Sequence, residues 1–267
     1  MPTLDDRRLG DPQQSGVSVP IDATLGVEGL PQSGTGQTSL LTGQNGAELH
    51  GNHFGPWVPV RLRPLVESSN LLSRALEGGH SAAFANAYPK GWPGNARNGR
   101  RVAGPPLAAR AAGLLTRDHS ALGRGEAVAS EIVNDGWRRW IGADLVPTIS
   151  PESAGTVFAQ IANVHDLTFF AHYSTDTAGH RGGMAGAVEA LERVDRFLAG
   201  VQGGLSADHT LMIVSDHGNI EDVTGGHTRN PVLGVLSGPA APWLSHRITS
   251  LVDVAPAVLG WLESVNE

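Results

Sequence analysis

The chain has 267 residues, of which 40% are hydrophobic and 17% charged, with a formal net charge of −7 and a pI near 5.9. This length and composition predict an ordinary soluble core and argue against a disordered chain. The acidic balance argues against a nucleic-acid partner, which would require a basic face. There are no cysteines, so disulfides and thiolate metal sites are excluded.

No apolar run reaches the roughly 18 residues that a membrane-spanning helix needs. The N-terminal residues also lack the apolar stretch of a signal peptide. We therefore expect a cytoplasmic protein with no membrane partner.

The first third of the chain predicts a loop, two helices and a strand. Residues 1–32 are rich in Gly, Pro, Asp and Gln, as expected of a loop. A helix is expected from Ser33, taken as its N-cap, to Gly43, and a second helix over 58–78. A short buried strand over 82–87 follows, and the Gly/Pro/Asn-rich stretch 88–101 predicts an exposed loop or lid.

The rest of the chain alternates between helical and strand patterns. Helices are expected over 106–115, 125–140, 151–164, 184–198 and 250–262, and buried strands over 167–171, 210–214 and 231–236. Such alternation predicts an α/β fold with a mostly parallel central sheet. We expect a single domain over 1–267, with a small cap or lid within about 88–150.

Three short segments in the second half carry candidate metal ligands: DTAGH at 176–180, SDHGN at 215–219 and HTRNPV at 227–232. They contain two carboxylates and three imidazoles, the donors that zinc, manganese or iron prefer: Asp176, His180, Asp216, His217 and His227. The first two segments follow predicted strands, where sites of open α/β sheets lie. A single His or Asp of this kind is more typical of a turn, but the five together favour a metal site.

The spacing of these residues indicates how they would be divided between two metal ions. Asp176 and His180 are four residues apart, so one helical turn places them on the same face. Asp216 and His217 are adjacent and diverge, so each can serve a different ion of a pair. His227 precedes a strand and can complete the shell of one ion.

A turn rich in hydroxyl groups, QSGTGQT at 32–38, lies far upstream of these segments. Its hydroxyls can simply cap a helix, which is the commonest use of Ser and Thr there. The N-terminus of a helix also suits a bound phosphate. A serine hydroxyl becomes a nucleophile when a base or a metal ion activates it.

These motifs resemble the alkaline phosphatase superfamily, in the branch of cofactor-independent phosphoglycerate mutase and phosphopentomutase. Asp-x-x-x-His, Asp-His-Gly-Asn and His-Thr-x-Asn-Pro-Val are the metal motifs of that branch. Its nucleophile motif is Ser or Thr, two variable residues, Gly and usually His, which Ser33 to Gly36 fit, with Gln37 in place of His. The resemblance covers 22–60 and 165–262, and it implies an alkaline phosphatase-like three-layer sandwich.

The resemblance implies a site with two divalent ions, manganese or zinc. Asp176, His180 and His227 would hold one ion, while Asp216 and His217 would hold the other beside the nucleophile Ser33.

The second ion of the family also takes an Asp from the end of the first strand, and the nearest match here is Asp5. The apolar strand that should precede Asp5 is missing. Either the gene begins further upstream, or the protein has lost that strand and part of one metal site.

The leading hypothesis is a two-metal phosphoryl-transfer enzyme that acts on a small phosphorylated substrate through a phosphoserine at Ser33. A phosphatase is favoured over a mutase, because 88–150 supplies only a small cap. The alternatives are a metal-deficient, non-catalytic relative that acts as a binding or regulatory protein, and a phosphodiesterase.

Overall fold

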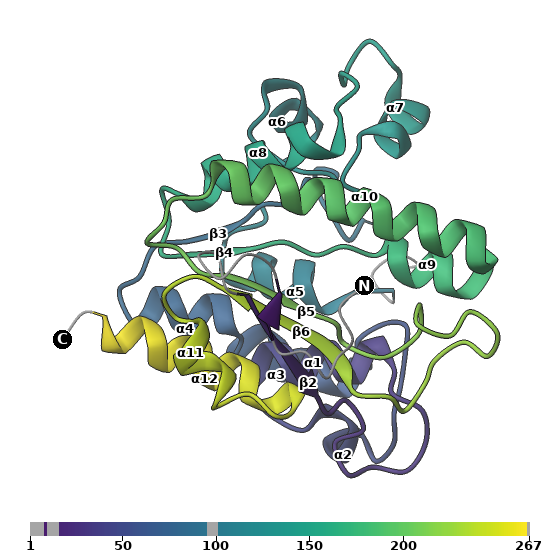
Figure 1. Cartoon of the computed structure of the whole chain (residues 1–267), viewed down its shortest axis with the longest axis vertical. Helices are drawn as coiled ribbons and strands as arrows, with labels where there is room; N and C mark the ends of the chain where they lie inside the picture. The colour runs from purple at the N-terminus through teal and green to yellow at the C-terminus, as the bar shows by residue number, and fades with distance from the viewer. Residues whose placement is uncertain (1–7, 10–15, 95–100, 266–267) are drawn as a thin grey trace.

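The computed structural model describes residues 8–9, 16–94 and 101–265. Helices lie on both sides of the strands, with α8 and α10 on one side and α4 and α12 on the other (Figure 1). The strands are β1 (Arg8–Leu9), β2 (Gly16–Ile21), β3 (Ala82–Phe84), β4 (Leu167–Phe169), β5 (Leu211–Val214) and β6 (Val232–Ser237).

The three longest helices, α8, α10 and α12, lie in the second half of the described chain. In order they are α1 (Ser33–Thr42), α2 (Gly46–His50), the 3-10 helix η1 (Val60–Leu62), α3 (Arg63–Ser68), α4 (Leu71–Glu77), α5 (Gly104–Ala111), α6 (His119–Arg124), α7 (Asp135–Ile141), α8 (Pro151–Ala162), α9 (Ser174–Arg181), α10 (Gly183–Gly204), α11 (Ala241–Ser245) and α12 (Leu251–Ser264). Within the described ranges, none of these helices combines the length and the apolar character needed to cross a membrane.

The structure shows a mixed α/β fold whose strand pairing differs from the expected one. A four-stranded sheet has the order β1-β2-β6-β5 and is antiparallel at each pairing, while β3 and β4 form a separate parallel pair. The prediction of a mostly parallel sheet is therefore wrong for the described strands. Parallel pairing needs a crossover, and the irregular segment 215–231 between β5 and β6 contains no helix, so β6 returns antiparallel.

Residues 1–32 contain a strand that was predicted as loop. β2 pairs with β6 over its length from Val17 to Ile21, whereas β1 pairs only with Gly16 and Val17. Pro20 therefore lies where no described strand pairs with β2 on the β1 side. A proline is tolerated at such an edge position because the lost N–H had no partner there.

Two of the predicted helices are broken in the structure. Residues 58–78 divide into η1, α3 and α4, because the Asn70 side chain accepts a hydrogen bond from Ser73 N–H and starts a new helix. The helix predicted over 125–140 is wrong in its first half. Gly125 adopts φ 68° and ends α6, and the next helix, α7, begins only at Asp135.

Other predicted elements are confirmed within a few residues, among them α1, α8, α12 and the strands β3 to β6. α10 is longer than predicted at both ends. One detail differs at α1, because Gln32 is the N-cap and Ser33 is the first helical residue.

The two largest apolar clusters of the described residues lie between the layers. Ile21, Leu41 and Leu251 belong to the core between the antiparallel sheet, α1 and α12. Phe158 and Phe197 belong to the core between α8, α10 and the parallel pair. α1 is buried along its whole length, so the residue at its first position is held rigidly.

The packing of α10 on α8 generates a test of the fold. A Cβ on Gly200 would overlap the main-chain oxygen of Glu152 in α8, whereas a Cβ on Gly186, in the same helix, would meet nothing within 4 Å. We expect Gly200→Ala to lower the free energy of unfolding by roughly 1–3 kcal/mol. Gly186→Ala should raise it by about 0.5–1 kcal/mol through helix propensity. Urea unfolding of both variants measures this difference, and equal effects would contradict the close approach of the two helices.

Candidate metal centre

Three segments that are distant in sequence meet at the candidate metal centre. α9 carries Asp176 and His180, the irregular segment 215–231 carries the other three candidate ligands, and α1 begins at Ser33. The structure brings all six residues together through the contacts described below. Asp5 lies outside the described residues.

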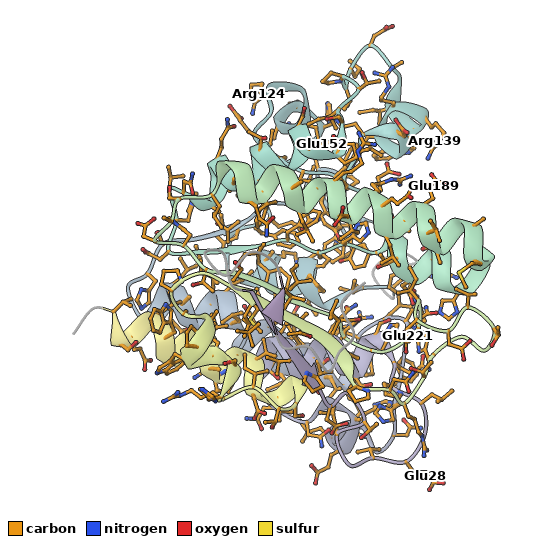
Figure 2. The ribbon with its side chains drawn as sticks, in the orientation of Figure 1. Glu28, Arg124, Arg139, Glu152, Glu189 and Glu221 are labelled. Carbon is orange, nitrogen blue, oxygen red and sulfur yellow. The ribbon has the colours of Figure 1, made fainter. Side chains whose placement is uncertain are left out.

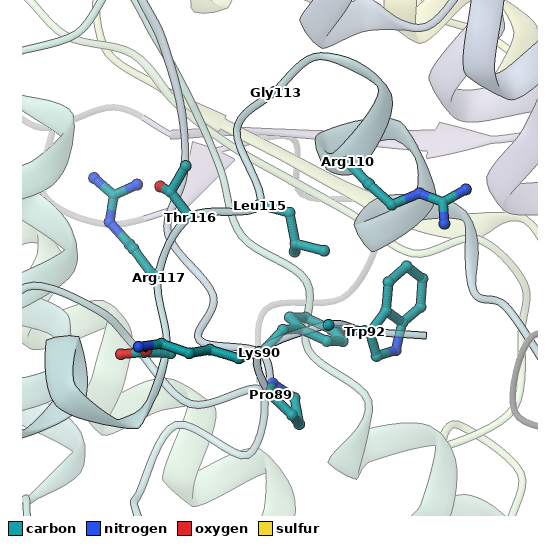
Figure 3. A pocket seen from close by; sticks show the side chains of 11 residues that line it. Pro89, Lys90, Trp92, Arg110, Gly113, Leu115, Thr116 and Arg117 are labelled. Carbon is teal, nitrogen blue, oxygen red and sulfur yellow. The ribbon is translucent and has the colours of Figure 1, made fainter. Parts of the chain in front are cut away.

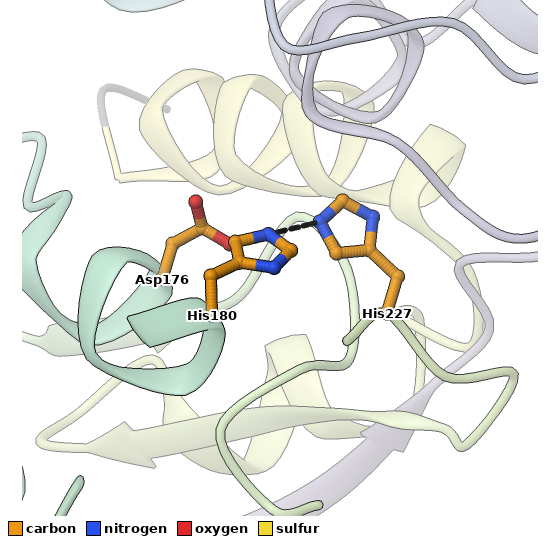
Figure 4. A group of neighbouring side chains, drawn as sticks. All are labelled: Asp176, His180 and His227. Carbon is orange, nitrogen blue, oxygen red and sulfur yellow. Dashed lines mark hydrogen bonds and ion pairs between the residues drawn. The ribbon is translucent and has the colours of Figure 1, made fainter. Parts of the chain in front are cut away.

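Asp176, His180 and His227 form the tightest group, with their side chains directed toward one another (Figure 4). The Nε2 atoms of His180 and His227 are 3.0 Å apart. The Oδ1 atom of Asp176 lies 3.4 Å from His180 Nε2 and 3.7 Å from His227 Nε2. Three donor atoms therefore surround a single point.

These distances fit a divalent cation. Ligand atoms around a tetrahedral ion with bonds of about 2.0–2.2 Å lie roughly 3.3–3.6 Å apart. Nδ1–H of His227 donates to the Pro31 carbonyl at 2.7 Å, so its Nε2 atom faces the group. Two imidazole nitrogens that face each other need a shared proton or a cation between them. The donor set therefore suits the ion that the motifs predict.

Asp216, His217 and Ser33 lie directly beside this group. His217 Nε2 is 2.8 Å from Ser33 Oγ, 3.7 Å from Asp216 Oδ1 and 3.7 Å from Asp176 Oδ1. The rings of His217 and His227 stack with their centroids 3.9 Å apart. Asp176 thus contacts both halves of a two-part cluster.

Charge within the cluster is reflected in two pKa shifts. Burial opposes ionisation of Asp176, but hydrogen bonds from His227 and Asn219 and the nearby imidazoles outweigh it and lower its pKa to about 2. Burial also disfavours the charged form of His227, yet its bonds to Asp176 and Pro31 raise its pKa. The carboxylate of Asp176 is therefore ionised and can bind a cation.

Gln37 connects the cluster to the start of α5. Its Nε2 donates to Asp216 Oδ2 at 2.9 Å, and its Oε1 accepts from Gly104 N–H at 2.9 Å. Gln37 stands where the resembling motif usually has His. It leaves Asp216 Oδ1 free on the side of His217.

Glycines in the motifs allow the segments to approach closely. A Cβ on Gly179 would overlap the Oδ1 atom of Asn219, and a Cβ on Gly36 would overlap the main-chain oxygen of Asp216. A side chain at position 36 would therefore require the main chain of Asp216 to move. At position 179 it would displace the Asn219 side chain, which bonds Asp176.

Two residues that make hydrogen bonds around the candidate ligands were not found from the sequence. Asn219 was noted only as part of a motif, yet its Nδ2 donates to Asp176 Oδ1 at 2.5 Å. Glu221 was not singled out, although it accepts hydrogen bonds from Asn219 N–H and the Thr228 hydroxyl. Their only sequence signal was proximity to the ligands.

The start of α1 offers few free donors. Thr35 N–H donates to the Phe54 carbonyl and Gly36 N–H to the Gln32 carbonyl. Among the described residues, this leaves the N–H groups of Ser33 and Gly34 to face a phosphate. The Ser33 hydroxyl caps no helix and lies against His217 instead.

Two cavities differ in volume and in the residues that line them. One of about 500 Å³ is lined by Gln32, which precedes Ser33, together with Glu28 and His53. The other, of about 220 Å³, is lined by Lys90 and Trp92 among others (Figure 3). The cation Lys90 in the smaller cavity is paired with Asp118 at 3.3 Å, so we assign no role to this cavity.

The sequence of this region matches a known class of protein. Residues 144–263 match the family model described as "Metalloenzyme superfamily". The matched range contains all five His and Asp candidates, which confirms the resemblance seen in the motifs.

Relatives of known name are similar to part of the chain. One is the 2,3-bisphosphoglycerate-independent phosphoglycerate mutase of Desulforudis audaxviator, 34% identical over 127 residues and 45% of this chain. Another, of the same name from Agrobacterium fabrum, is 35% identical over 127 residues and 43% of this chain. The match spans about a quarter, 25%, of the length of each relative.

Among solved structures, the PH0037 protein from Pyrococcus horikoshii matches 71% of this chain and 51% of its own, with a TM-score of 0.43 and 13% identity.

The bond from Gln37 to Asp216 can be tested by metal content. We expect Gln37→Met to weaken retention of an ion that Asp216 would hold about tenfold, because the carboxylate loses the donor that orients it. Thr42→Val, which removes a hydroxyl bonded to the Thr38 carbonyl in the same helix, should not change it. Metal analysis after dialysis against graded chelator measures both, and equal retention would show that Gln37 does not orient the ligand.

Proposed function

We propose that the protein is a metal-dependent phosphoryl-transfer enzyme that acts on a small phosphomonoester through a phosphoserine at Ser33. The observation that carries this proposal is the contact of 2.8 Å between Ser33 Oγ and His217 Nε2 within the cluster of Asp and His donors. Support also comes from the family model and from relatives named as phosphoglycerate mutases.

The donors divide into two groups. Asp176, His180 and His227 would hold one divalent ion, and Asp216 with His217 would hold the other. Manganese and zinc both suit these nitrogen and oxygen ligands. When bound, such ions polarise phosphoryl oxygens and stabilise an alkoxide.

The side chains of the protein would carry out the transfer of the phosphoryl group. Ser33 lies at the first position of a buried helix, so its Oγ is held in place. In the proposed step, Ser33 Oγ would lose its proton and bond to phosphorus as the bond between phosphorus and the alcohol oxygen breaks, and that oxygen would leave protonated as the alcohol. The phosphoryl group then passes to water in a phosphatase, or to a second substrate hydroxyl in a mutase. We assign the larger cavity, beside Gln32, to the alcohol part of the ester.

Two observations favour different acceptors. Residues 88–150, described apart from 95–100, contain only the short helices α5, α6 and α7. A cap of this size favours access of water and therefore hydrolysis. The names of the relatives favour a mutase. We take hydrolysis as the first candidate and transfer within the substrate as the second.

Substitution of the nucleophile tests the proposal. We expect Ser33→Ala to abolish manganese-dependent turnover of a chromogenic phosphate ester and of 3-phosphoglycerate, because no phosphoserine can form. Ser39→Ala, in the same helix but away from the cluster, should retain turnover. Product analysis separates glycerate and phosphate from 2-phosphoglycerate, and mass spectrometry of acid-quenched protein locates the phosphoryl group.

Other outcomes would contradict the proposal. Turnover that persists in Ser33→Ala would exclude the serine intermediate. Protein that retains no transition-metal ion and turns over neither ester would favour a non-catalytic binding protein. Turnover of phosphodiesters alone would favour a diesterase.

A further inference from the structure

Glu221 lies in the irregular segment between β5 and β6 (Figure 2). Both oxygens of its carboxylate accept hydrogen bonds. Oε2 accepts from Asn219 N–H at 2.7 Å, while Oε1 accepts from the Thr228 hydroxyl and from Asn230 Nδ2 at 3.3 Å. One carboxylate therefore joins the segment that carries Asp216 and His217 to the segment that follows His227.

The connection continues to the third segment of the centre. Asn219, only 4% exposed, donates from Nδ2 to the Oδ1 atom of Asp176 at 2.5 Å and to its main-chain oxygen at 3.1 Å. Thr228 N–H donates to the Gly218 carbonyl at 3.1 Å, so the two loops also pair through their backbones. A chain of hydrogen bonds thus runs from Glu221 to α9.

We propose that Glu221 is a positioning residue of the metal centre, whose carboxylate fixes His217, His227 and, through Asn219, Asp176 relative to one another. The inference rests on the proposed metal-dependent function. Glu221 acts through the ligands, because its own oxygens are occupied by donors. Binding an ion itself would break the bonds that hold the loops.

The next residue, Asp222, makes hydrogen bonds within its own turn of the loop. Asp222 is exposed, and its Oδ1 accepts from the N–H group of Thr224 at 3.0 Å and from its hydroxyl at 2.6 Å. These bonds stay within one turn and reach none of the candidate ligands. Asp222→Ala removes the same charge from the same loop and is therefore the matched control for Glu221→Ala.

The test measures the affinity of the metal-free protein for manganese and zinc, by competition with a fluorescent chelator well below the unfolding temperature. We expect Glu221→Ala to weaken binding 10- to 100-fold, in the range typical of groups that orient ligands. Glu221→Gln keeps the shape and one acceptor oxygen, so it should lie between Glu221→Ala and wild type. Asp222→Ala should stay within about twofold of wild type, since a side chain orients a metal ligand only through hydrogen bonds that reach it.

The outcomes separate this inference from the proposed function. If wild type binds neither metal, the proposed function and the role of Glu221 both fall. If wild type binds and Glu221→Ala binds equally well, the positioning role alone is overturned, even where the variant unfolds at a lower temperature. If Glu221→Ala does not fold, Glu221→Gln decides, and wild-type affinity in that variant overturns the inference.

Discussion

The structure depends on holding electron-rich donors together around Asp176. His180, His217 and His227 each place Nε2 within 3.7 Å of its Oδ1 atom. Side chains of this kind repel or compete for protons unless a cation or a set of hydrogen bonds satisfies them. The arrangement of α1, α9 and segment 215–231 is best understood as the frame that keeps these donors in place.

The frame is built mainly from hydrogen bonds between segments that are distant in sequence. His227 is oriented by the Pro31 carbonyl, Asp216 by Gln37, and Asp176 by Asn219. Each of these bonds joins two different segments of the centre. Displacing one segment would therefore disturb ligands on another, which explains why the irregular chain after β5 can hold a defined site.

The sequence predicted the candidate ligands because their chemistry and spacing are local properties. It predicted α8 and α12 for the same reason, since helical periodicity is visible in one window. It did not predict that β6 runs antiparallel to β5, because pairing is decided by distant contacts. Gly125 was taken as a helix start although its φ of 68° ends α6. Glu221 was missed because its partners become neighbours only when the chain folds.

Hydrogen bonds also join the candidate metal centre to Tyr88 and Gly104. Gln37 joins Asp216 to Gly104, the first residue of α5. The hydroxyls of Tyr88 and Tyr173, the residue directly before α9, lie 3.2 Å apart. Tyr88 is thus bonded to the residue directly before α9, and Gly104 to a residue of α1. Displacing either residue would therefore disturb an element of the candidate centre, just as displacing one segment of the centre would disturb ligands on another.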